Sequence, residues 1–272
     1  MCELFALSSR QPTRVSLSFE AFAEHGDPGG ENRDGWGIAY YPGRSSRLMK
    51  EPAPAGDSEL VRFIEVHDYA SGLVVSHIRH ASQGHISFDN THPFERELGG
   101  TSHVFCHNGD LGQEIGRLAK GLGRFRPIGQ TDSELAFCYL LSALEPMWLG
   151  AVGVPPLLER TAAVRECASL FAELGQANFL YADGDALFVH AHWREPADGS
   201  EGRGPGLHVL THPLETAPHP VDVPGIRIRH AARNGPVAAV ASVPLTSAPW
   251  EPIEQGTLLV VRDGVVVDRA RT

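Results

Sequence analysis

The sequence opens with the stretch Met1-Cys2-Glu3-Leu4-Phe5-Ala6-Leu7. Removal of the first residue would leave Cys2 with both a thiol and a free α-amino group. An α-amino group titrates at about pH 8 and a thiol at about pH 8.5, so the amine can deprotonate the thiol directly or through a water. Such a residue is an N-terminal nucleophile that carries its own base. The alternative is that Cys2 is a small apolar residue that opens a buried strand.

Length and composition indicate an ordinary globular protein. The chain has 272 residues, of which 42% are hydrophobic, which is enough for a large core. No run of about 18 apolar residues predicts a membrane span, and Glu3 stands where a secretory signal would carry basic residues. No Cys-x-x-Cys spacing predicts zinc, and a disulfide framework is not expected from Cys2, Cys106, Cys138 and Cys167. We therefore expect a cytoplasmic protein.

Charge and histidine content narrow the class of ligand. The formal net charge of -10 disfavours a nucleic-acid partner, because phosphates require basic patches. Fourteen histidines do not follow a metal-ligand spacing, so we expect no metal and no other cofactor. Their groups are His77/His80/His85, His103/His107 and His190/His192. His92, before Pro93, is expected to be a hydrogen-bonded loop residue.

Apolar runs and turn signals predict hairpins and separate helices. Strands are expected over residues 73–78, 104–107 and 179–181, with hairpin turns at Asp183-Gly184 and Asp263-Gly264. Helices are expected after a cap at Asp57 or Ser58, between Leu157 and a stop at Gly175, and after the capping box Thr131-Asp132-Ser133-Glu134. Residues 195–206 predict a mobile surface loop. This mixture favours layers of sheet and helix over βαβ units.

Asn108 and Gly109 are candidates for the stabilisation of negative charge. A thiol that attacks an amide carbonyl generates an oxyanion, which requires donors already in place. A side-chain amide beside a glycine N–H at the end of a strand supplies two of them. The alternative is an ordinary Asn-Gly turn.

Arg79 and Asp132 are candidates for the recognition of an amino-acid head group. Such a group needs a cation for its carboxylate and an anion for its ammonium, and a guanidinium can bind a carboxylate in a bidentate way. The alternatives are a surface ion pair for Arg79 and a carboxylate that stabilises the first helical turn for Asp132.

The order of these motifs resembles the class II glutamine amidotransferases, the cysteine branch of the N-terminal nucleophile hydrolases. The motifs are Cys2, Asp34-Gly35-x-Gly37, His77-x-Arg79, Asn90-x-His92-Pro93, His107-Asn108-Gly109 and Thr131-Asp132-Ser133-Glu134. The full length, with Pro244-Leu245-Thr246 and Trp250-Glu251-Pro252, is similar to stand-alone bacterial members. The resemblance implies that Cys2 is the nucleophile, that Asn108 and Gly109 form the oxyanion hole, and that Arg79 and Asp132 hold the glutamine head group. We add His80 and Trp36 as substrate-binding candidates.

The resemblance also implies a fold and an activity. It implies one α+β domain over residues 2–272, an αββα sandwich of two antiparallel sheets with its core motifs in residues 2–145. The implied reaction is cleavage of the γ-amide bond of glutamine or a γ-glutamyl compound through a Cys2 thioester, away from any membrane. One alternative is a glutaminase subunit that supplies ammonia to a synthase partner, and homo-oligomers are a further expectation. A second alternative function is that of a catalytically silent γ-glutamyl-binding or regulatory module.

Two local departures from the family pattern bear on the gating loop. His80 follows Arg79 where ammonia-supplying members commonly have Trp, and Glu31-Asn32-Arg33 precedes Asp34 where they have Arg-Gly.

Overall fold

The protein is described from a computed structural model. The described residues are 2–17, 34–67, 69–80, 84–195, 202–211, 221–223, 226–230, 235–245 and 248–272. Met1, the motif residues Asn32 and Arg33, and residues 196–201 of the expected 195–206 loop lie outside them.

The first sheet contains nine strands of the described chain, and all of its pairings are antiparallel. Its long strand β1 (Glu3–Leu17) lies between β4 (Ala70–Ile78) and β14 (Val237–Ala241). Beyond β4 follow β2 (Trp36–Tyr40) and β3 (Arg47–Glu51), and beyond β14 follow β11 (His208–Leu210) and β15 (Glu251–Pro252). The far half of β1 pairs with β13 (Ile226–His230), which pairs with β12 (Val221–Val223). Residue 2 therefore adjoins the middle of the sheet.

The second sheet has six antiparallel strands within the described residues. Their order is β17 (Val265–Arg271), β16 (Thr257–Arg262), β8 (Leu187–Ala191), β7 (Asn178–Ala182), β6 (Thr101–Asn108) and β5 (Phe94–Leu98). A separate two-stranded ribbon joins β9 (Trp193–Arg194) to β10 (Gly204–Pro205). The predicted strands and both hairpins are present. Asp263 and Gly264 have φ of 52° and 75°, as a tight primed turn requires.

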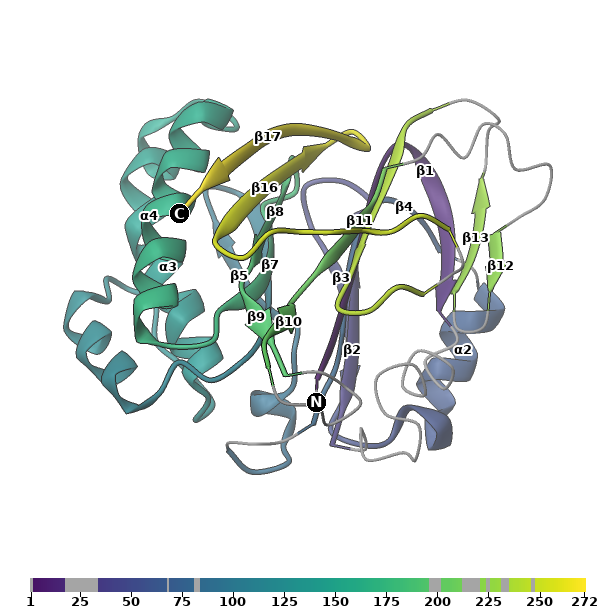
Figure 1. Cartoon of the computed structure of the whole chain (residues 1–272), viewed down its shortest axis with the longest axis horizontal. Coiled ribbons are helices and arrows are strands. Elements are labelled where there is room, and N and C mark those ends of the chain that lie inside the picture. The colour runs from purple at the N-terminus through teal and green to yellow at the C-terminus, as the bar shows by residue number, and fades with distance from the viewer. Residues whose placement is uncertain are drawn as a thin grey trace.

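The two sheets pack face to face, and helices cover their outer faces (Figure 1). Leu4 and Ala6 of the first sheet meet Val104 and Cys106 of the second in a buried apolar cluster. The opposite face of the first sheet packs on α2 (Glu59–His67). The outer face of the second sheet packs on α3 (Asp132–Gly150) and α4 (Leu157–Leu174). The expected αββα architecture is confirmed.

Three 3-10 helices complete the elements of the described residues, and side-chain caps explain where two of the α-helices begin. The 3-10 helices are η1 (Ala55–Asp57), η2 (Phe88–Asn90) and η3 (Gln113–Gly121). Ser58 Oγ accepts from the N–H of Val61 at 3.0 Å, so Ser58 caps α2. Thr131 Oγ1 accepts from the N–H of Glu134 at 3.2 Å, as the capping box predicts. The Glu134 carboxylate turns instead to the 128–129 backbone. The box is therefore half realised.

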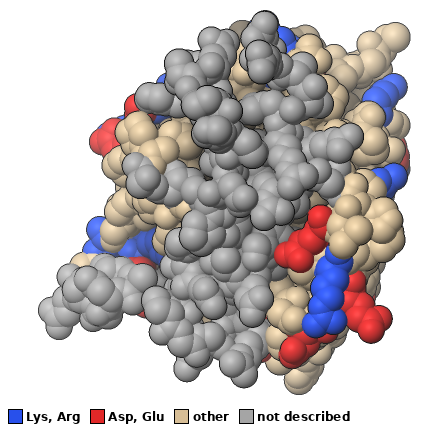
Figure 2. Space-filling model, turned by 90° about the vertical axis from the view of Figure 1, so that its right-hand side faces the viewer, with Lys and Arg blue, Asp and Glu red and all other residues tan. Residues whose placement is uncertain are grey.

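The surface and helix lengths complete this description. On the face shown in Figure 2, acidic and basic side chains of the described residues lie next to one another. Within the described ranges, no helix combines the length and the apolar character that a membrane span needs.

Candidate active site

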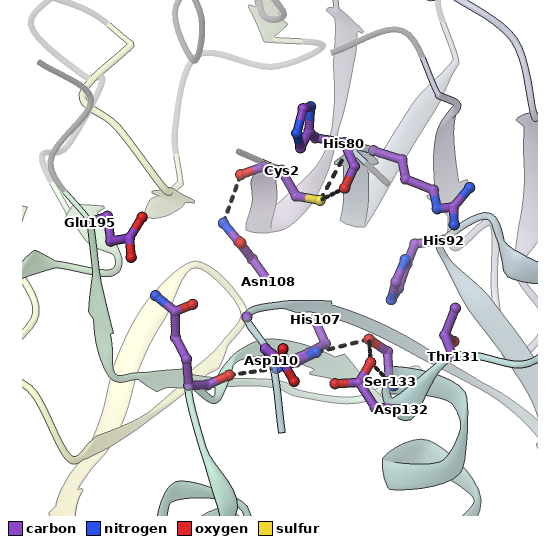
Figure 3. A pocket seen from close by; sticks show the side chains of 13 residues that line it. Cys2, His80, His92, His107, Asn108, Asp110, Thr131, Asp132, Ser133 and Glu195 are labelled. Atoms are coloured by element: carbon purple, nitrogen blue, oxygen red, sulfur yellow. Dashed lines mark hydrogen bonds between the residues drawn. The ribbon is translucent and has the colours of Figure 1, made fainter. Parts of the chain in front are cut away.

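A cavity of about 370 Å³ lies where β1 begins and where β4 and β6 end (Figure 3). Because side chains alternate along strands, Cys2 and Asn108 share the faces whose next inward residues, Leu4 and Cys106, fill the core between the sheets. The residues that line the cavity are Cys2, Arg79, His80, His92, His107, Asn108, Gly109, Asp110, Thr131, Asp132, Ser133, Gln176 and Glu195. Six of the seven sequence-predicted site residues are among them.

The Cys2 thiol is held by the backbone of His80. The N–H of His80 lies 3.1 Å from Cys2 Sγ, and Sγ lies 3.2 Å from the carbonyl oxygen of the same residue. Burial raises the pKa of this thiol, and the His80 backbone and the Arg79 guanidinium partly offset the rise. The backbone of His80 thus holds the Cys2 thiol, while the residue also lines the cavity.

Asn108 and Gly109 lie at the end of β6, facing Cys2. Asn108 Nδ2 donates to the carbonyl oxygen of Cys2 at 2.6 Å. Gly109 has φ of 151°, and a Cβ atom there would overlap the carbonyl oxygen of Gln176. Only glycine fits this position, because the backbone is in the region that L side chains avoid and the Gln176 backbone, just before β7, lies very close.

Arg79 follows the last residue of β4 and is 3% exposed. Its backbone N–H donates to the carbonyl of Gly35 at 2.7 Å, and its Nη1 donates to the carbonyl of His85 at 3.4 Å. Burial lowers the pKa of its guanidinium, and the charges of Cys2 and Asp34 counteract that effect. The structure therefore places this cation in the wall of the cavity, buried and not at the open surface.

Asp132 begins α3, and its carboxylate already has backbone partners. Oδ2 accepts from the N–H of Leu111 at 2.9 Å, and Oδ1 accepts from the N–H of Ser133 at 2.7 Å. The alternative role in the first helical turn is thus present alongside its place in the cavity wall. Because each carboxylate oxygen has two lone pairs, these bonds leave acceptor capacity for a ligand ammonium.

His107 and Ser133 connect the two sides of the cavity. His107 Nδ1 lies 2.8 Å from Ser133 Oγ, and its Nε2 lies 2.9 Å from the carbonyl oxygen of Gln176. Since a carbonyl only accepts, Nε2 carries a proton. The hydrogen bond from His107 Nε2 holds the carbonyl of Gln176, which is the carbonyl that lies close to Gly109.

His92 lies in the loop between η2 and β5, as expected, but the expectation that its ring is hydrogen-bonded was wrong. Neither of its ring nitrogens has a hydrogen-bond partner among the described residues, and its ring stacks on that of His77 at 4.2 Å. The backbone around it is held instead, because Lys50 Nζ donates to the carbonyl of Thr91 at 2.6 Å. Burial keeps the pKa of His92 well below its usual value, so the ring is neutral.

Trp36 lies away from the cavity, which corrects its assignment to substrate binding. Its side chain is fully buried in the cluster between the first sheet and α2. The alternation along β2 is the reason: Gly37, the next residue, faces inward and a Cβ atom there would overlap the carbonyl of His92. Trp36 therefore supports the sheet from outside.

Several cavity residues were missed by sequence reasoning. Gln176 and Glu195 follow α4 and β9, where no spacing relates them to the motifs. Ser133 was part of the Thr131-Asp132-Ser133-Glu134 motif but was given no role of its own, because its contact with His107 joins positions 26 residues apart in sequence. The other cysteines, Cys106, Cys138 and Cys167, are buried, and burial raises the pKa of each thiol.

Across the described ranges, no group of three or more His, Cys, Asp or Glu side chains is arranged to hold a metal ion.

Comparison with known proteins identifies the family to which the chain is similar. The model of the family "Glutamine amidotransferases class-II" matches residues 1–272. The chain is 37% identical over 200 residues to YafJ of Escherichia coli (strain K12), which covers 71% of this chain and 75% of that protein.

Solved structures agree. A crystal structure described as a predicted glutamine amidotransferase from Pseudomonas aeruginosa has a TM-score of 0.69 and 27% identity, covering 98% of this chain and all of that one. Glutamine phosphoribosylpyrophosphate amidotransferase from B. subtilis shares the fold with a TM-score of 0.60 at 15% identity, over 99% of this chain and 49% of that one. The αββα layers, the inward-facing Cys2 beside Asn108, and these matches lead to one conclusion: the chain belongs to the class II glutamine amidotransferases.

Proposed function

We propose that this protein hydrolyses the γ-amide bond of glutamine or of a γ-glutamyl compound through a thioester on Cys2. The observation that carries the proposal is that Cys2, Asn108, Arg79 and Asp132 line one cavity although they come from separate elements. The cavity combines a thiol, a side-chain amide, a cation and an anion, which are the groups this reaction needs.

The chemistry begins with methionine removal, which frees the α-amino group of Cys2 as a base. The thiolate attacks the γ-carbonyl carbon, and the oxyanion accepts from Asn108 Nδ2 and the Gly109 N–H. The C–N bond then breaks as the leaving nitrogen takes the proton held by the α-amino group. Water, deprotonated by the same amine, attacks the thioester and releases glutamate and the free thiol.

The head group of the substrate is held apart from the reacting carbonyl. Arg79 binds the α-carboxylate and Asp132 accepts from the α-ammonium, since each has the opposite charge in a mostly buried wall. Recognition of both charges favours a free γ-glutamyl group over glutamine inside a peptide chain.

The decisive experiment measures glutamate release from glutamine and from a panel of γ-glutamyl amides, together with intact mass. Cys2→Ala should abolish release and the acyl adduct, whereas Cys106→Ala, which alters a fully buried packing residue, should retain activity. If a folded wild-type protein binds these compounds without releasing glutamate, the silent binding module replaces the hydrolase.

A second candidate function is ammonia supply to a synthase partner. It is favoured by the match to the B. subtilis amidotransferase, of which this fold covers 49% of the chain. Purification from the native host, followed by mass spectrometry and light scattering, tests for such a partner and for a homo-oligomer. A copurifying enzyme that raises glutaminase activity would favour this candidate over a lone hydrolase.

A further inference from the structure

Glu3 and Arg194 form a buried ion pair directly behind the proposed nucleophile. Arg194 Nη2 lies 3.0 Å from Glu3 Oε1, and Nη1 lies 3.4 Å from Oε2. The Glu3 residue is fully buried and Arg194 is 4% exposed. Because residues alternate along β1, the Glu3 side chain points to the face opposite that of Cys2. The ion pair therefore holds Glu3, the residue after Cys2, on the face of β1 opposite to the thiol.

The strand that carries Arg194 is itself fastened to the catalytic region. The carbonyl of Trp193 accepts from Gln176 Nε2 and from Asn178 Nδ2, both at 2.8 Å. Asn178 Nδ2 also lies 3.3 Å from the carbonyl of Asn108. Figure 1 places β9 close to the N-terminus. These hydrogen bonds fix the position of Arg194 relative to Asn108. Through the ion pair, Glu3 is held in a fixed position as well.

We propose that Arg194 is a positioning residue for Cys2: through Glu3 it holds the nucleophile against His80 and Asn108 and balances the carboxylate that adjoins the thiol. The proposal rests on the proposed function in so far as Cys2 is the nucleophile. It assigns a role to two residues outside the cavity, neither of which touches the substrate.

The electrostatic part follows from the groups around the thiol. After burial, the Glu3 charge is among the causes that raise the pKa of Cys2, whereas Arg79 at the end of β4 lowers it. Burial raises the pKa of Glu3, and Arg194 is the foremost group that opposes this. On β11, burial and then the charge of Arg194 lower the pKa of His208. In the processed protein the α-amino group of Cys2 is a further charge at the thiol.

The test is the pH dependence of Cys2 alkylation by iodoacetamide, followed by peptide mass spectrometry, in wild type, Glu3→Gln, Arg194→Gln and the double variant. Arg194→Gln leaves the carboxylate unbalanced and should raise the alkylation midpoint by about one pH unit. Glu3→Gln leaves the guanidinium unbalanced and should lower it by a similar amount. The double variant should return close to the wild-type midpoint.

The kinetic expectation distinguishes positioning from substrate contact. Arg194→Gln should lower kcat by about tenfold with KM within about twofold of wild type, because no substrate bond is removed. Arg194→Lys keeps the charge but not the paired contact, so it should retain the wild-type alkylation midpoint while kcat falls. This conservative variant also covers the case in which Arg194→Gln does not fold.

Arg160→Gln is the matched control, since Arg160 forms a buried pair with Asp183 at 2.5 Å outside the cavity. It should lower thermal stability without moving the alkylation midpoint. Equal midpoints in all folded variants, or shifts of the same sign in both single variants, would overturn the proposal. Alkylation needs no turnover, so opposite shifts in a protein that hydrolyses nothing would contradict only the proposed function.

Discussion

Asn108 and Cys2 are joined by a hydrogen bond of 2.6 Å from the side-chain amide of the first to the backbone carbonyl of the second. The group assigned to the oxyanion therefore also holds the nucleophile, with one amide hydrogen for each task. In the proposed reaction this double use links the position of the thiol to that of the charge it generates.

Replacement of Asn108 should act on the chemical step. Its second hydrogen matters mainly when negative charge develops, so Asn108→Ala should lower kcat by about 10²–10³ with a much smaller change in KM. Asn108→Asp, which keeps the size but cannot donate when ionised, should be equally impaired. Steady-state kinetics on folded variants is the measurement. A change confined to KM would remove Asn108 from the oxyanion site.

Replacement of the head-group residues should act on binding. Arg79→Ala and Asp132→Ala each remove a charge-assisted bond of about 1.5–3 kcal/mol, so KM should rise roughly ten- to a hundredfold. Asp132→Ala should also lower stability, since Leu111 and Ser133 lose an acceptor for their N–H groups. Kinetics with glutamine and a γ-glutamyl dipeptide, with thermal unfolding as control, separates these effects. Unchanged KM in both variants would refute the assignment.

Gly109→Ala should be strongly destabilising, because the new Cβ would overlap the carbonyl of Gln176 in a backbone region with φ of 151°. We expect a loss of more than about 2 kcal/mol in the free energy of unfolding. Gly116→Ala, where a Cβ atom would meet nothing within 4 Å, is the control and should leave stability almost unchanged. Urea unfolding compares the two, and equal stabilities would show that the backbone at 109 adapts.

Methionine removal should be required for turnover. Protein made in a bacterium should lack Met1, because the small side chain of Cys2 suits the removal, and the freed amine is the proposed base. Intact mass is expected to be one methionine short. Full activity in a sample that uniformly retains Met1 would show that another group is the base.

Buried histidines should make the fold sensitive to acid. Burial lowers the pKa of His103 to about 3, and its ring bonds to Tyr181 and Leu98 as a neutral group. Between about pH 6.5 and that value the unfolded chain binds more protons than the native one, so stability falls as pH falls, by about 1.4 kcal/mol per pH unit for this group. His103→Gln should reduce the proton uptake on unfolding at pH 5 by about one. Urea titrations at pH 5 and pH 7 measure it, and an unaltered slope would contradict the neutral state.

Local signals predicted the three α-helices of the described chain and some of its strands, but they missed strands such as β2 and β3 and the contacts between elements. Ser58, Thr131 and the Asp263-Gly264 turn act through neighbours in sequence, so their roles were readable. The face of β2 that points toward the second sheet is set by the register of β2 with β4. This register places the Trp36 side chain on the opposite face, away from the cavity, and the sequence does not reveal it.

Long-range partners leave even less trace in sequence. Nothing near Glu3 predicts its partner 191 residues away, since a buried pair needs only one acid and one base anywhere in the chain. His92 was misjudged for the same reason, because its stacking partner His77 lies on a different element.

The close contact between Gly109 and Gln176 joins the first half of the chain to the second, so it bears on whether a shortened chain could function. The motifs from Cys2 to Glu134 lie before residue 145. Gln176, which lies against Gly109, β14, which pairs with β1, and Arg194, which pairs with Glu3, all lie beyond it. A fragment that ends after residue 145 would keep these motifs and the pairing of β1 with β4, but it would lose β14, Gln176 and Arg194. In the proposed reaction the reacting side chains come from the first half of the chain, whereas the elements that hold them in place come from both halves. Truncation after residue 145 should therefore abolish activity completely.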